Sequence, residues 1–298
     1  MYGAFASTGG RLTPTLGPGA MQIELHDITP LYLEYAIRQR EQAYFATYPE
    51  LFRHYYQYWV APGDLVRMTE NTVQEKATLI KSKLPVLERA FTCKGFSGKI
   101  RVVLFVGANT TNGHAFWDET HQSFVVWLPV ETYDSPLQVD VFVAHEIIHA
   151  LHYTRCPEFY FQDERAKHLV GRQVITEGIA TRGTQKILAC DDVMALWADY
   201  VSLSFARQWH ERCGTRLSEM AQRILNEWDD SQETNEWFSL WDENDVTRYR
   251  GGYYVGLRAI EKISQERVMN LQSLLALEKQ ELEALILRAL REMAEGRA

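Results

Sequence analysis

The sequence predicts an α+β fold that is mostly helical. Two apolar, β-branched segments have the composition of strands, whereas most of the remaining chain has helical periodicity and helix-capping residues. Hydrophobic residues make up 46% of the 298 residues and charged residues 23%, a balance that excludes collagen-like and disordered chains. We expect residues 21–298 to form a single domain. Residues 1–20, rich in glycine and without apolar periodicity, are expected to form a disordered tail.

The first structured element is expected to be a short strand. Residues 22–26 alternate polar and apolar side chains, which is typical of a half-buried strand. The aromatic-rich segment 29–59 then favours one or two helices with a break near Pro49. A longer helix is predicted over residues 69–91, with a kink at Pro85.

The middle of the chain predicts a small mixed sheet. Residues 99–106 and 123–128 are apolar and rich in β-branched or aromatic side chains, so each is expected to be a buried strand. The connection 107–113 contains glycine, asparagine and threonine, a composition typical of turns. Together with the strand near the N-terminus, these segments predict a sheet of three or four strands.

From residue 136 onward the chain is predicted to be almost entirely helical. Ser135 before Pro136 is a favourable pair for an N-cap and first helical position. The helix that they open is expected to continue to about Tyr153. Further helices are expected over residues 164–189, 192–212, 217–227, 247–264 and 271–295. The domain should therefore consist of helices and a small sheet over 21–135, followed by a helical part over 136–298.

The helix predicted after Pro136 carries the pattern His145-Glu146-Ile147-Ile148-His149. Two histidines four residues apart project from the same face of a helix, so both imidazoles can bind one Zn²⁺ ion. Glu146 lies beside them, where its carboxylate can take a proton from a metal-bound water molecule. The apolar neighbours keep the surroundings dry, which favours acidification of that water. The sequence therefore predicts one zinc ion per chain.

Zinc needs a third protein ligand, and we expect Glu177 to supply it. Glu177 is followed by Gly178, which allows another segment to approach closely. The metzincin pattern would place a glycine and a third histidine where this chain has His152 and Arg155, so that pattern is absent. The rival third ligands are His152, Asp163, Glu164 and His168.

These segments resemble the motifs of the gluzincin metallopeptidases. HEIIH at 145–149 followed by TEGIAT at 176–181 is similar to the two motifs of the aminopeptidase N-like enzymes, and RGGYYVG at 250–256 resembles their Tyr-x-x-Gly segment. The order of elements over about 99–265 also resembles a family of predicted bacterial Zn-dependent proteases. The resemblance implies a zincin-like domain whose active-site helix packs on the small sheet. It also implies a tyrosine hydroxyl that stabilises the tetrahedral intermediate.

Three tyrosines are candidates for that hydroxyl. Tyr249 and Tyr253 are four residues apart and are expected to share one face of a helix. Tyr254 is rotated by about 100° from Tyr253 and is expected to pack into the core. We therefore predict Tyr253 and Glu146 as the catalytic residues.

The predicted function is zinc-dependent hydrolysis of peptide bonds, with a peptide or protein as the substrate. Residues 123–128 are a candidate strand for pairing with an extended peptide. One alternative is a zinc hydrolase of another amide substrate, although the Glu-Gly-Cys motif of deformylases is absent. A second alternative is a catalytically degenerate fold that acts as a binding module. Retention of Glu146 favours catalysis over this second alternative.

Composition excludes several other classes of partner. The net charge is −8 and no cluster of five or more Lys and Arg residues is present, so nucleic acid is not expected as a partner. The sequence contains no stretch of about eighteen consecutive apolar residues, so no membrane span is predicted. The four cysteines are far apart, and the N-terminus lacks the pattern of a secretory signal. We therefore expect a cytoplasmic protein with buried, free thiols.

Overall fold

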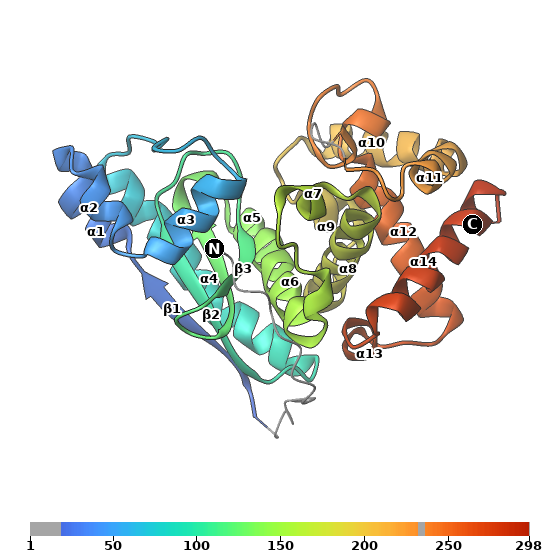
Figure 1. Ribbon diagram of the computed structural model, residues 1–298, viewed down its shortest axis with the longest axis horizontal. Helices are drawn as coiled ribbons and strands as arrows, with labels where there is room; N and C mark the ends of the chain where they lie inside the picture. Colours follow the sequence, from blue (N-terminus) through green and yellow to red (C-terminus); the bar gives the residue numbers. More distant parts are fainter. Residues whose placement is uncertain (1–18, 232–235, 298) are drawn as a thin grey trace.

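The computed structural model describes residues 19–231 and 236–297 and shows an α+β fold that is mostly helical (Figure 1). The predicted fold class is therefore confirmed. A small mixed sheet and its helices form the N-terminal part of the molecule, and the helices of the C-terminal half pack beside them (Figure 1). Most of the predicted tail, residues 1–18, lies outside the described residues, and the first strand begins at Met21.

The sheet has four strands in the order β1-β2-β4-β3, where β1 pairs in parallel with β2, β2 in parallel with β4, and β3 antiparallel with β4. The strands are β1 (Met21–Asp27), β2 (Gly98–Phe105), β3 (His114–Asp118) and β4 (Ser123–Pro129). The central strands β2 and β4 are buried on both faces, which explains their continuous apolar sequences. The mixed sheet and three of its strands agree with the sequence prediction, whereas β3 lies in a segment for which no strand was predicted.

The α-helices are α1 (Thr29–Tyr35), α2 (Glu41–Phe45), α3 (Pro49–Tyr58), α4 (Glu70–Cys93), α5 (Pro136–Gln138), α6 (Ala144–Arg155), α7 (Glu164–His168), α8 (Val170–Leu188), α9 (Asp192–Trp197), α10 (Leu203–Thr215), α11 (Leu217–Asn226), α12 (Gly251–Glu266), α13 (Leu271–Leu275) and α14 (Lys279–Ala294). Short helical turns are η1 (Ala36–Arg38), η2 (Val130–Thr132), η3 (Val139–Val143), η4 (Pro157–Phe159), η5 (Glu236–Phe238) and η6 (Val246–Arg248). The chain is predominantly helical from Pro136 onward, as predicted.

Several predicted helices are divided in the structure. Leu169 has an extended conformation, and its backbone forms an isolated bridge with Ser231, which separates α7 from α8. Ala198, with a φ of 50°, ends α9 before α10 begins. The predicted helix over 271–295 is likewise divided into α13 and α14, and the one over 247–264 begins only at Gly251. Apolar periodicity continues across these breaks, so the pattern alone does not reveal them.

The N-terminal helices differ from the prediction in a similar way. The segment 29–59 contains three short α-helices, and the last of them begins at Pro49, where a break was expected. The long helix α4 continues through Pro85 from Glu70 to Cys93. No helix in the described part of the chain is long and apolar enough to cross a membrane. All four cysteines are free thiols, but only Cys156 and Cys213 are buried, whereas buried thiols were expected throughout.

A helical run from Pro136 to Arg155 carries the HEIIH segment into the centre of the molecule. The Ser135 hydroxyl accepts a hydrogen bond from the Gln138 backbone N–H at 3.1 Å, which confirms the predicted N-cap. After α5 the chain makes one π-helical turn, η3, and then continues as α6. Helix α6 contacts β3, β4 and α8, and residues 144–153 are all buried (Figure 1).

Helices α8 and α12 touch through their backbones. A Cβ atom added to Gly178 would lie 2.5 Å from the carbonyl oxygen of Gly256. A Cβ atom added to Gly256 would lie 2.4 Å from the carbonyl oxygen of Val174. Backbone atoms of packed helices cannot move aside as the end of a flexible side chain can. Only glycine therefore permits this approach of the two helices.

The variant Gly178→Ala is expected to lower the free energy of unfolding by about 1–3 kcal/mol, because the new methyl group forces α8 and α12 apart. Urea denaturation measures this change. The matched control is Gly214→Ala in α10, where a Cβ atom would meet only the end of the Tyr254 side chain, at 3.3 Å from its hydroxyl. We expect the control to be unchanged or slightly more stable, because alanine favours helix. Equal denaturation midpoints for the two variants would contradict the prediction.

Candidate metal centre

Three buried or half-buried side chains converge where α6 meets α8. His145 and His149 come from α6, and Glu177 comes from α8. The two Nε2 atoms of the histidines are 3.1 Å apart. Glu177 Oε2 lies 3.0 Å from Nε2 of His145 and 3.4 Å from Nε2 of His149. The structure thus brings the three predicted metal ligands together in one group.

The spacing of these three atoms fits a zinc ion. Tetrahedral coordination with bonds of about 2.0–2.1 Å places ligand atoms about 3.3 Å apart. The observed separations of 3.0–3.4 Å match this edge length. Two imidazole nitrogens that face each other at 3.1 Å need a proton or a cation between their lone pairs. Two imidazoles and one carboxylate are also a donor set that zinc prefers.

The charges of the cluster act on one another strongly. Burial would raise the pKa of the Glu177 carboxyl, but His149 and His145 outweigh it and hold that pKa well below its usual range. Burial lowers the pKa of His145. Burial also acts to lower the pKa of His149, but the carboxylates of Glu177 and Glu146 outweigh it and raise that pKa. The Glu177 carboxylate is therefore ionised, which favours a cation beside it.

Glu146 is buried beside the two histidines, and within the described residues its Oε2 atom has no hydrogen-bond partner. Burial raises the pKa of Glu146 to about 7. Gly113, at the end of the segment 107–113, packs against it, since a Cβ atom added to Gly113 would lie 2.9 Å from Cγ of Glu146. A buried carboxylate oxygen without a partner is rare and calls for an explanation. This oxygen is available to accept a hydrogen bond or a proton.

The segment 107–113 is held by residues that the sequence analysis did not identify. The Glu131 carboxylate accepts hydrogen bonds from the backbone N–H groups of Gly107 and Asn109, each at 3.0 Å. The Tyr55 hydroxyl accepts one from the Ala108 backbone at 2.8 Å. Such anchors follow from contacts between distant segments, and no local pattern in the sequence marks them.

The three candidate tyrosines have different surroundings. The Tyr253 ring centre lies 6.3 Å from that of His145. Burial, followed by the charge of Glu177, raises the pKa of the Tyr253 hydroxyl. Tyr254 points elsewhere and packs edge-on against His210 with ring centres 5.1 Å apart. The structure therefore places Tyr253 at the metal centre and Tyr254 in the core.

The expectation that Tyr249 and Tyr253 share a helix face is wrong. Tyr249 precedes α12 and stacks on Trp197 with ring centres 5.8 Å apart. Arg250, with a φ of 58°, separates Tyr249 from the helix. A left-handed residue breaks the helical period, so spacing by four no longer places two side chains on one face.

The rival third ligands lie outside the cluster. The His152 ring is fully buried and packs on Phe159 with ring centres 4.8 Å apart. The Asp163 carboxylate caps α7 by accepting a hydrogen bond from the Ala166 backbone at 2.7 Å. The Glu164 carboxylate lies 3.2 Å from Nε2 of His168. Among the described residues, only Glu177 joins the two histidines in such a group.

The expected peptide-binding strand at 123–128 is also corrected. Strand β4 pairs with β2 on one side and β3 on the other, so neither of its edges is open to a peptide. The edge of the sheet near α6 belongs to β3, whose residues are largely buried. Because β3 is short and directly follows a turn, the sequence did not indicate that it forms this edge of the sheet.

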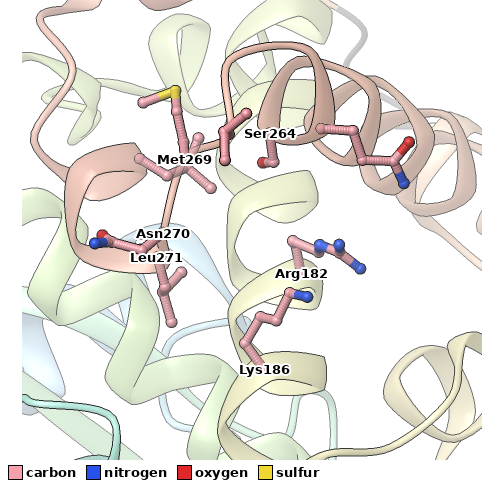
Figure 2. A pocket seen from close by; sticks show the side chains of 9 residues that line it. Arg182, Lys186, Ser264, Met269, Asn270 and Leu271 are labelled. Atoms are coloured by element: carbon pink, nitrogen blue, oxygen red, sulfur yellow. The ribbon is translucent and has the colours of Figure 1, made fainter.

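A separate cavity of about 380 Å³ lies between α8, α12 and α13 (Figure 2). Figure 2 shows Arg182 and Lys186 of α8 facing the segment that carries Met269, Asn270 and Leu271. Arg182 pairs with Glu261 at 3.0 Å, so its charge is balanced. None of the three candidate metal ligands lines this cavity. The cavity is therefore not part of the metal centre.

No protein-family model and no curated protein matches this chain. The class of site is therefore defined by its geometry: two histidines and one glutamate arranged to hold a metal ion, with a further unpartnered glutamate and a tyrosine ring beside them.

Proposed function

We propose that this protein is a zinc-dependent peptide hydrolase. The observation that carries the proposal is the convergence of His145, His149 and Glu177 at zinc-ligand spacing, next to the buried and unpartnered oxygen of Glu146. The likeness of the HEIIH and TEGIAT segments to gluzincin motifs supports it. A zinc ion held by these three residues would acidify a water molecule and polarise the carbonyl of the scissile bond.

The chain's own residues supply the remaining chemistry. Glu146 accepts the proton of the attacking water through its free oxygen and then returns this proton to the leaving amine. The Tyr253 hydroxyl donates a hydrogen bond to the oxygen that becomes negative in the transition state. Gly113 packs against the Glu146 side chain, which is buried and so largely removed from bulk water.

A chelation experiment tests the proposed function. The purified protein is expected to contain about one zinc ion per chain by elemental analysis and to hydrolyse casein or a mixture of fluorogenic peptides. A chelator should abolish the hydrolysis, and added zinc should restore it. Absence of zinc after reconstitution would contradict the metal centre. Bound zinc without any peptide hydrolysis would instead favour a hydrolase of another amide or a binding module.

The variant Tyr253→Phe is expected to lower kcat roughly 10²-fold with little change in KM, because it removes one donor to the oxyanion and keeps the ring. Steady-state kinetics on one fluorogenic peptide measures the effect. The matched control is Tyr254→Phe, which removes a hydroxyl from the same helix on its other side and should leave kcat nearly unchanged. Small and equal effects in both variants would remove Tyr253 from the mechanism.

A further inference from the structure

Arg250 has no carboxylate partner, although it lies beside the metal centre. No Asp or Glu oxygen of the described residues lies within 4.0 Å of its guanidinium, whereas its neighbours Arg248 and Arg258 both form ion pairs. The Arg250 guanidinium lies instead over two aromatic rings. Its Cζ atom is 4.4 Å from the ring centre of Tyr253 and 4.8 Å from that of Trp197.

The backbone of Arg250 is held in a conformation that arginine rarely adopts. Its φ and ψ are 58° and 20°, in the left-handed region. Its N–H donates a hydrogen bond to Ser239 O at 2.9 Å, and its carbonyl accepts one from the Tyr253 N–H at 3.1 Å. Strained residues persist where surrounding contacts hold them, and they concentrate at sites that bind ligands. The backbone and the two rings together therefore fix the position of the guanidinium.

Arg250 lies close to the metal centre, with the Tyr253 ring in contact with both. The Arg250 Cζ atom and the His145 ring centre lie 4.4 Å and 6.3 Å from the Tyr253 ring centre, so they are no farther apart than about three residues of extended peptide.

We propose that Arg250 binds a carboxylate of the substrate within about three residues of the scissile bond. The Tyr253 hydroxyl engages part of the guanidinium, and the remaining N–H groups of the planar fork match a carboxylate in a bidentate geometry. The carboxylate is either the C-terminus of a short peptide or the side chain of Asp or Glu. This inference rests on the proposed peptide hydrolysis and adds to it the substrate class.

The first test compares cleavage sites in a mixture of synthetic peptides, identified by mass spectrometry. The variant Arg250→Asn removes the guanidinium, and asparagine tolerates the left-handed backbone. The wild-type protein should cleave about tenfold more often where a carboxylate lies within three residues of the bond, and Arg250→Asn should lose this preference. Arg250→Lys, which keeps the charge without the planar fork, should be intermediate. The control Arg248→Asn should keep the preference.

The second test measures binding without turnover, in zinc-loaded protein that carries Glu146→Gln. The probes are a fluorescent penta-alanine peptide with a free C-terminal carboxylate, the same peptide as an amide, and an amidated peptide with one internal Glu. We expect at least one of the carboxylate-bearing probes to bind about tenfold or more tightly than the neutral amide, and which one does so identifies the source of the carboxylate. Adding Arg250→Asn should abolish this difference.

The outcomes separate the inference from the proposed function. Equal binding of all three probes, or a preference that survives Arg250→Asn, would overturn the inference. An equal loss of turnover on neutral and acidic peptides would also overturn it and would assign Arg250 to oxyanion stabilisation. Carboxylate binding through Arg250 in a protein that cleaves no peptide would support the inference and reject the peptidase. Zinc content and melting temperature establish that each variant is folded.

Discussion

Replacement of Glu146 by glutamine is expected to lower kcat about 10²–10⁴-fold while zinc remains bound. The amide has nearly the size of the carboxylate, so packing against Gly113 should be preserved. The amide cannot take a proton from water at neutral pH. Among the described residues, the proposed ligand Glu177 is the only carboxylate grouped with the two histidines, so no other carboxylate can replace Glu146 as the base. Steady-state kinetics together with elemental analysis measures both parts of the prediction.

The matched control for this variant is Glu164→Gln. Glu164 is a carboxylate outside the metal cluster that pairs with His168, so its neutralisation should change neither kcat nor zinc content. Turnover like that of the wild type in Glu146→Gln would show that Glu146 is not the base. Loss of zinc from the same variant would show that this carboxylate acts instead on the metal ligands.

Removal of one metal ligand is the second large effect that we expect. Glu177→Ala should weaken zinc binding by at least about 100-fold, because loss of a residue that only supports a ligand already costs 10–100-fold. Turnover should fall with the bound metal. Since a ligand that binds only the folded state stabilises it, zinc should raise the melting temperature of the wild type far more than that of the variant.

The control for ligand removal is His168→Ala, which deletes an imidazole near α8 that does not reach the cluster. This variant should keep its zinc and its stabilisation by zinc. If Glu177→Ala binds zinc as tightly as the wild type does, Glu177 is not a ligand. The thermal measurement does not depend on catalysis, so it tests the metal centre even if the substrate class is different.

The parts of the site that depend on local spacing could be predicted from the sequence. His145, Glu146 and His149 lie on one short helix, and the helical period alone places the two imidazoles together. Glu177 was identified because a glycine follows it, and that glycine is where α12 approaches. Tyr253 was predicted partly from a helix face shared with Tyr249, which the structure does not have, although its rotation away from Tyr254 within α12 is as predicted.

The parts that depend on distant contacts could not be predicted. Strand β3 has only five residues, and four of them are buried, so it lacks the alternation that marks an exposed strand. The break at Leu169 depends on pairing with Ser231, more than sixty residues further along the chain. Arg250 reads as an ordinary surface residue until its position against Trp197 is seen. In each case a tertiary contact outweighs the local preference.

The glycine contact between α8 and α12 also fixes the spacing of the two helices that carry the proposed ligand Glu177 and the proposed catalytic residue Tyr253. Glu177 is adjacent to one of these glycines, and Tyr253 lies three residues before the other. Main-chain atoms in direct contact set the spacing of the two helices, and main-chain atoms have no rotamers. Thermal exchange among side-chain conformers in the core therefore leaves unchanged the spacing of the two helix backbones that carry Glu177 and Tyr253. Replacement of Gly178 or Gly256 by any larger residue would push the two helices, and the residues they carry, apart.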